Sequence, residues 1–182
     1  MESAHDDEGW NQIRSGIALI DWSRLARFDK TQLTFEASGE NEFEHSPAGH
    51  RDVHPEFGRL ICWITFSVGA EYLAKGVCLL KGNLKTSKGK FGALRFDSID
   101  ALEKSDLKTV SAAMKLLGKA IRNRDVHRYE RDVRAGHFLA VPNNFVPAFN
   151  SLLACLDKDT LRSALRDMVL SAQIQSFGVP KL

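Results

Sequence analysis

The distribution of proline limits what this chain can fold into more than any other feature of its sequence. The 182 residues include five prolines, and none lies between Pro55 and Pro142. Because proline removes a backbone hydrogen bond and disrupts a helix interior, this stretch allows long uninterrupted helices. With 43% hydrophobic residues, the chain can also bury a substantial core. We therefore expect an all-α fold.

Apolar residues recur at the three- and four-residue spacing of a helix face in several segments. Pro55 suits the first turn of one such helix and Gly82 its stop. Asp106 can cap another, and Asp159 or Thr160 the last. Helices are expected over 10–28, 55–81, 98–106 and 107–124, with two more within 148–177. The sequence thus predicts a bundle of four to six helices.

We expect a single helical domain over residues 1–182. Residues 1–50 hold an acidic N-terminal helix and a connection rich in Glu, Ser, Gly and His, while residues 51–182 form the core. Charge divides in the same way. Residues 1–58 carry 12 acidic and 5 basic side chains, whereas residues 59–182 carry 11 acidic and 20 basic. Such asymmetry points to a nucleic-acid partner or to an acidic segment that covers a basic surface.

The cysteines and the N-terminus indicate a cytoplasmic protein. Cys62, Cys78 and Cys155 are odd in number and lie among apolar residues, as expected of buried reduced thiols rather than of a disulfide framework. The first ten residues are acidic and lack the apolar core of a secretion signal. The longest apolar run, 60–70, is too short for a membrane span of about 20 residues.

The segment "KAIRNRDVHRYERDVRAGHF", residues 119–138, places five arginines, two histidines and a tyrosine directly after an apolar helical run. Within it, "IRNRDVHRY" has the pattern Arg122, four residues, His127, one residue, Tyr129. This pattern resembles the signature of HEPN domains (higher eukaryotes and prokaryotes nucleotide-binding), whose ribonuclease members carry Arg, four to six residues, His. The resemblance covers roughly residues 55–160.

The resemblance implies roles for four residues. Arg122 and His127 would be catalytic, and Asn123, directly after the arginine, would be a positioning residue. Tyr129 stands where a branch of HEPN toxins carries a tyrosine that a nucleotidyltransferase antitoxin modifies. The resemblance therefore implies a toxin or phage-defence ribonuclease with a neutralising protein partner, although an ordinary half-buried tyrosine is an alternative reading of Tyr129.

The chemistry of RNA cleavage without a metal gives separate reasons for these residue types. It needs a base for the 2′-hydroxyl, a cation for the charge on the phosphate oxygens and an acid for the leaving 5′-oxygen. Histidine can serve as base or acid near neutral pH, and arginine holds phosphate in a planar fork. One chain offers one such arginine and one such histidine. A homodimer with a site shared between two chains is therefore expected.

Helix geometry separates the two catalytic candidates. Five residues correspond to about 140° around an ideal helix, so an unbroken helix would point Arg122 and His127 apart. We expect the helix to break between Asn123 and Asp125, with one of them capping a new helix whose N-terminus favours phosphate. The alternative is that the segment is a solvated helix face with local ion pairs.

Further residues are expected to assist this site. "GAEYLAKG", residues 69–76, resembles a helix found upstream of the motif in HEPN proteins, and makes Glu71 either a helper near the cleft or part of a buried ion pair with Lys75 or an arginine. RNA contacts are expected from five basic residues: Arg124, Arg128, Lys85, Lys88 and Lys90. The lysines also suit an exposed solubilising loop.

Other chemistry finds little support. His45, His50 and His54 lie close together, but their spacing matches no zinc signature and no cysteine pair accompanies them. Phosphate-binding glycine loops, dinucleotide fingerprints and Gly-x-Ser-x-Gly elbows are absent, so no cofactor or metal is expected. The main alternative to a nuclease is a non-catalytic HEPN-like module that binds RNA or a partner protein.

Overall fold

A computed structural model describes residues 4–23, 55–82, 84, 85, 88, 94–118 and 141–168. These ranges contain five α-helices, one 3-10 turn, η4 (Phe96–Ser98), and one π-helical turn, η6 (Val141–Phe145), and no strand. The helices are α1 (Ala4–Trp22), α3 (Pro55–Lys81), α4 (Lys104–Leu116), α6 (Val146–Ala154) and α7 (Lys158–Leu165). The predicted all-α bundle is confirmed.

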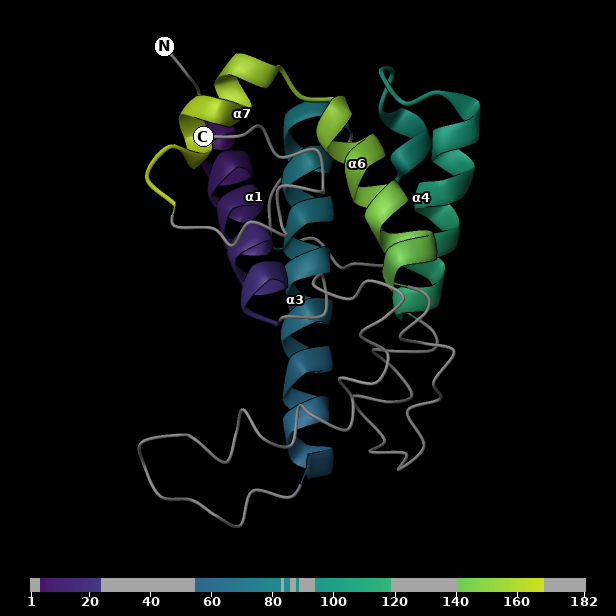
Figure 1. Cartoon of the computed structure of the whole chain (residues 1–182). Helices are drawn as coiled ribbons and strands as arrows, with labels where there is room; N and C mark the ends of the chain where they lie inside the picture. Colours follow the sequence, from purple (N-terminus) through teal and green to yellow (C-terminus); the bar gives the residue numbers. More distant parts are fainter. Residues whose placement is uncertain are drawn as a thin grey trace.

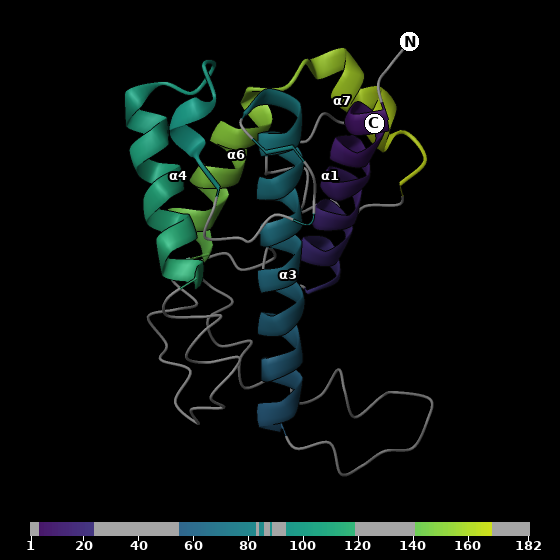
Figure 2. The same cartoon turned by 180° about the vertical axis from the view of Figure 1, so that it is seen from behind.

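Helix α3 lies between the two halves of the bundle (Figures 1 and 2). Helix α1 packs along one side of it, and α6 contacts another side, with α4 packed on α6. Helix α7 then carries the chain back to contact α1 (Figure 1). Helices from both ends of the described chain therefore meet around α3.

Glycines set the distance between α1 and α3. Gly16 lies opposite Gly69 and Gly9 opposite Gly76, so the two helices run antiparallel. A Cβ on Gly16 would lie 2.5 Å from the backbone nitrogen of Leu73 and 2.8 Å from the carbonyl oxygen of Gly69. A Cβ on Gly76 would lie 2.7 Å from the carbonyl oxygen of Gly9. The backbones therefore approach more closely than any larger residue would allow.

Isoleucines of α1 fill the space beside these glycines. Ile13, Ile17 and Ile20 are at most 2% exposed, which confirms the apolar face predicted for the N-terminal helix. The helix covers Ala4–Trp22, so it begins earlier than the predicted 10–28, and residues 24–28 of that prediction lie outside the described residues. Its first turns begin in a polar stretch where no apolar period marks the start, and Ser23 follows it as a buried turn residue.

Three phenylalanines join α3 to the second half of the bundle. The ring centroids of Phe66 and Phe145 are 5.2 Å apart in an edge-to-face arrangement, and those of Phe66 and Phe149 are 6.0 Å apart. All three side chains are at most 1% exposed. Such pairs stabilise a core by about 0.5–1.5 kcal/mol beyond the area that they bury. They fix η6 and α6 against α3.

The bounds of α3 agree with those predicted from the sequence, whereas the start of α4 differs from its prediction. The helix predicted over 55–81 has these bounds in the structure. The short helix predicted over 98–106 is wrong, because α4 already begins at Lys104 with Glu103 as its cap residue and Asp106 lies within its first turn. Only the 3-10 turn Phe96–Ser98 precedes it.

The cap of α7 is Asp157 and neither of the two expected residues, Asp159 and Thr160. Its Oδ1 accepts hydrogen bonds from the backbone N–H of Thr160 at 2.8 Å and from Thr160 Oγ1 at 2.7 Å. These hydrogen bonds lower the pKa of the Asp157 carboxyl. Helix α7 is thereby fixed at the end that lies after α6.

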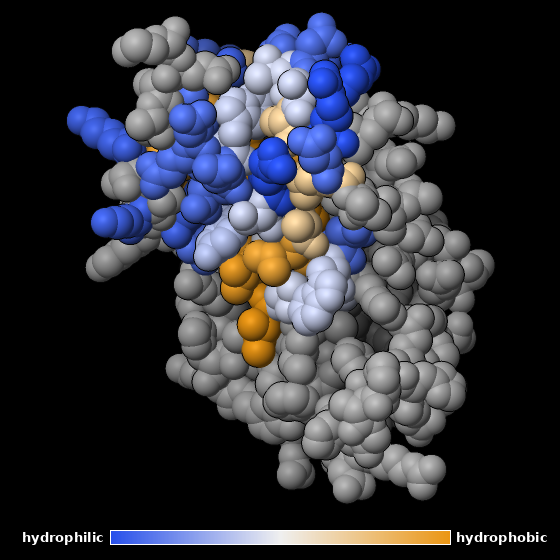
Figure 3. Space-filling model, turned by 90° about the vertical axis from the view of Figure 1, so that its left-hand side faces the viewer, coloured by the Kyte–Doolittle hydropathy of each residue, from blue (hydrophilic) through white to orange (hydrophobic). Residues whose placement is uncertain are grey.

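The surface on the side of α1 and α7 is mostly polar, with an apolar area below it (Figure 3). Among the described residues, Trp22 and Ile64 are the large apolar side chains that remain exposed, at 66% and 36%. No helix in these ranges is long and apolar enough to cross a membrane.

Replacing Gly16 by alanine should lower the free energy of unfolding by about 1–3 kcal/mol, the usual effect of an extra atom in a well-packed core. The new Cβ would meet backbone atoms of α3, which cannot move without separating the helices. Gly9→Ala is the comparison, because its Cβ would meet Leu80 Cγ and Cδ2 at 2.7 Å, in a partly buried side chain that can shift, while the nearest backbone atom, the Gly76 carbonyl oxygen, would be 3.4 Å away. Urea unfolding followed by circular dichroism measures both, and a Gly16→Ala protein as stable as Gly9→Ala would contradict the packing described.

Candidate functional site

Most of the predicted catalytic segment lies outside the described residues. This holds for Arg122, Asn123, Arg124, Asp125, His127, Arg128 and Tyr129, and also for Lys90, His45, His50 and His54. The structure does describe the helices on either side of the segment 119–140. How the seven motif residues lie relative to one another stays a prediction.

The described ends of that segment lie close to each other in the bundle. Leu117, in the last turn before the segment, is 1% exposed, and Phe145, shortly after it, is fully buried. Turn η6 contacts α4, and α4 and α6 pack side by side in Figures 1 and 2. The described residues on either side of the segment, Leu117 after α4 and Phe145 in η6, therefore both belong to the core in which α4, η6 and α6 pack together.

Two of the predicted RNA-contacting lysines are described and exposed. Lys85 and Lys88 follow α3, in the segment after Gly82. Next to Lys85, Leu84 is buried, and its backbone N–H donates to the carbonyl oxygen of Cys78 at 3.2 Å. This hydrogen bond ties the start of the segment to the last turn of α3 and leaves the Lys85 side chain in solvent.

Glu71 forms the buried ion pair that the sequence left open as one alternative. Its Oε1 lies 2.7 Å from Lys75 Nζ, one turn further along α3, and each side chain is 11% exposed. One turn before Glu71, Ser67 is 3% exposed, and its hydroxyl has no hydrogen-bond partner among the described residues. Spacing of four residues places all three on one face of α3. The pair therefore forms within one helix, between side chains one turn apart that are both largely buried.

The buried thiols match the expectation for reduced structural cysteines where they are described. Cys78 and Cys155 are free and buried. Burial raises the pKa of the Cys78 thiol to about 12, and burial also raises the pKa of Cys155, with a further rise from the charge of Asp106. Because the thiolate is the reactive form, neither group is prepared for nucleophilic chemistry at neutral pH.

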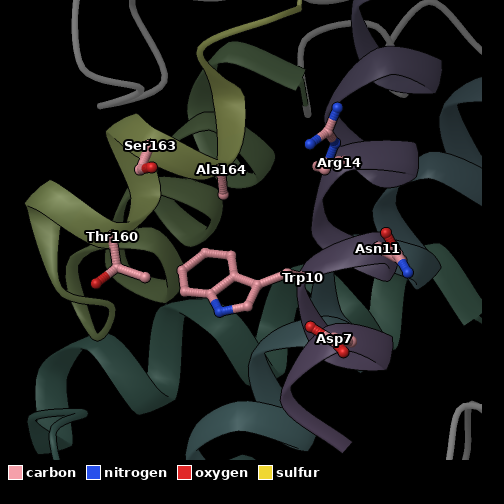
Figure 4. Close-up of a pocket in the computed structure, with 7 residues that line it drawn as sticks. All are labelled: Asp7, Trp10, Asn11, Arg14, Thr160, Ser163 and Ala164. Carbon is pink, nitrogen blue, oxygen red and sulfur yellow. The ribbon is translucent and has the colours of Figure 1, made fainter. Parts of the chain in front are cut away.

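A pocket of about 390 Å³ between α1 and α7 was not foreseen from the sequence. Figure 4 shows the Trp10 indole extending from α1 toward Thr160 and Ala164 of α7, with Asp7 and Arg14 on either side of it along α1. The sequence shows Trp10 and Arg14 at a spacing of four residues. Nothing local to them predicts that α7, about 150 positions later, forms the opposite wall.

Within the described ranges, no group of three or more His, Cys, Asp or Glu side chains is placed to hold a metal ion. Comparison with models of known protein families, with curated proteins and with solved structures gives no match.

Replacing Glu71 of the Glu71–Lys75 pair by leucine should lower the free energy of unfolding by about 3–5 kcal/mol, because the Lys75 ammonium then stays buried without the carboxylate that it contacts. Replacing both by leucine should be much less destabilising than the sum of Glu71→Leu and Lys75→Leu. Chemical unfolding of the four proteins of this double-mutant cycle measures the coupling.

The exposed pair Arg162–Asp159, 3.1 Å apart with side chains 55% and 90% exposed, provides the control. Its cycle should show little coupling, because solvent screens exposed charges. Equal coupling in the two pairs would mean that the Glu71–Lys75 pair is as well solvated as one on the surface.

Proposed function

We propose that the protein is a metal-independent endoribonuclease of HEPN type, in which Arg122 and His127 cleave RNA. The observation that carries the proposal is the sequence Arg122-Asn123-x3-His127-x-Tyr129, which comes after α4 in a chain whose described elements are all helical. Supporting it are the net positive charge of residues 59–182 and the two exposed lysines, Lys85 and Lys88.

The proposed reaction needs no group beyond side chains and the RNA itself. His127 removes the proton of a 2′-hydroxyl, whose oxygen attacks the adjacent phosphorus while the bond to the 5′-oxygen breaks. Arg122 stabilises the charge on the phosphate oxygens, and a second histidine protonates the departing 5′-oxygen. The products carry a 2′,3′-cyclic phosphate and a 5′-hydroxyl.

The second histidine in this scheme comes from a second copy of the chain. Each chain supplies one Arg122 and one His127, so a two-fold symmetric dimer would bring two of each to one cleft. Asn123 or Asp125 would cap a new helix whose N-terminus favours the phosphate at this cleft. Arg124, Arg128 and Lys90 would join Lys85 and Lys88 in contacting the RNA backbone. Glu71, engaged with Lys75, would act on the fold of the site rather than on RNA.

A toxin or defence role follows from the same resemblance. An uncontrolled ribonuclease harms the cell that makes it, so a neutralising partner is part of the proposal. Tyr129 would be the point at which a nucleotidyltransferase-type antitoxin acts, two residues from His127. Attachment of a nucleotide there would place new negative charge and bulk beside the histidine.

A non-catalytic helical module that binds RNA is the second candidate. It is favoured by the basic excess of residues 59–182, which would attract RNA whether or not His127 acts as a base. Both candidates should bind RNA, but only the ribonuclease should cleave it.

Purified protein should cleave total RNA in EDTA, and His127→Ala and Arg122→Ala should each lower the cleavage rate by about 10²–10⁴-fold, as expected on loss of an acid–base or charge-stabilising group. His137→Ala and Arg162→Ala are matched controls, since each removes a residue of the same type outside the motif. Gel electrophoresis of labelled RNA measures the rates.

RNA binding without cleavage by the wild type would favour the binding module. Cleavage that survives in both motif variants would place the activity elsewhere.

A further inference from the structure

The pocket between α1 and α7 has the size and the chemistry of a small-ligand site. Its volume of about 390 Å³ falls within the range of about 300–1,000 Å³ that is usual for such pockets. Side chains of α1 form one wall and side chains of α7 the other: Asp7, Trp10, Asn11, Arg14, Thr160 and Ser163. In Figure 4 the Trp10 indole lies between the two helices, with Asp7 and Arg14 on either side of it along α1 and Asn11 directed away from it.

Trp10 supplies a fixed aromatic surface. Its side chain is half-buried and packs against the hydrophobic core, while the indole extends into the pocket toward α7 (Figure 4). A ring held in this way is suited to stacking on a planar ligand, because little side-chain freedom is lost on binding.

Opposite charges flank the indole along α1. Asp7 and Arg14 are seven residues apart, about 10.5 Å along the helix axis, and Trp10 lies between them. Neither the Asp7 side chain nor the Arg14 side chain has an ion pair or hydrogen bond to another described residue. The Arg14 guanidinium and the Asp7 carboxylate are therefore available, within the described part of the chain, to a ligand in the pocket.

This arrangement selects among ligand classes. A free amino acid carries its two charges too close together to reach both side chains, and an acidic peptide would be repelled by Asp7. A nucleoside monophosphate has a planar base for Trp10, a phosphate for the Arg14 fork and amino or hydroxyl donors for Asp7. The phosphate and the base lie at opposite ends of the nucleotide, so the phosphate can contact Arg14 while donors on the base point toward Asp7.

We propose that the pocket between α1 and α7 binds a nucleotide, with the base stacked on Trp10 and the phosphate held by Arg14. The nucleotide is either free or the monophosphorylated end of an RNA strand. This site is formed by residues other than Arg122 and His127, so the proposal does not depend on ribonuclease activity.

Isothermal titration of the full chain with AMP tests the site. AMP should bind once per chain, and Arg14→Gln should weaken it about tenfold, the effect of losing one charge-assisted contact. Arg162→Gln removes the same charge from the outer surface of α7 and should leave the affinity unchanged. Adenosine should bind more weakly than AMP and equally to wild type and Arg14→Gln. Inorganic phosphate alone should bind more weakly than AMP.

Trp10 requires a pair of variants, because it also packs against the core. Trp10→Phe keeps an aromatic ring and should retain most of the AMP affinity, whereas Trp10→Leu should lose it while circular dichroism shows an intact fold. If Trp10→Leu unfolds, the Arg14→Gln comparison still decides the question.

The proposal is overturned if the wild type shows no AMP binding at millimolar concentration, or if Arg14→Gln and Arg162→Gln bind AMP equally. An oligoribonucleotide with a terminal monophosphate that displaces AMP identifies an RNA end as the source, and one that does not identifies a free nucleotide. AMP contains no phosphodiester bond to cleave, so these results stand apart from the outcome of the cleavage assay.

Discussion

The close contact of α1 with α3 is the interaction on which the rest of the described structure depends. Gly16 and Gly69 let the two backbones meet, and Ile13, Ile17 and Ile20 are then buried against α3. Helix α3 presents Phe66 on another side to Phe149 of α6. Because α7 rests on α1 and follows α6 in the chain, a change in the distance between α1 and α3 would move both walls of the pocket around Trp10.

The bounds of a helix could be predicted where its ends carry a proline, a glycine or another local start or stop signal. Pro55 and Gly82 mark the ends of α3, and the structure agrees with both. The start of α1 lies in polar residues, so its isoleucines revealed the helix but not its bounds. For α7, several acceptors stand close together, and the hydrogen bonds of Thr160 select Asp157. Glycine is a weak helix former, so local propensity gives no reason for Gly16 and Gly69 within helices. Their stabilising effect, the close approach of two backbones, arises only when α1 and α3 pack together.

The candidate functional residues likewise include some that local sequence predicts and others that only tertiary packing brings together. Glu71 and Lys75 are one turn apart, so their ion pair was an open alternative from spacing alone, while their burial required the fold. Trp10 and Thr160 meet through tertiary structure that no local pattern encodes. The proposed catalytic role of Arg122 and His127 rests on the sequence pattern. The structure adds that buried residues, Leu117 before the pattern and Phe145 after it, belong to the packed core of α4 and η6.

The central claim is that the 2′-hydroxyl of RNA is the nucleophile in a reaction that needs no metal. The most direct measurement uses an oligoribonucleotide that the protein cuts, synthesised again with 2′-deoxyribose only at the cut position, with both incubated in EDTA and analysed by mass spectrometry. The first should yield a 2′,3′-cyclic phosphate and a 5′-hydroxyl, and the second should stay intact at that position. Cleavage of both strands at the same bond would contradict 2′-hydroxyl attack, and failure to cut any RNA would contradict the nuclease itself.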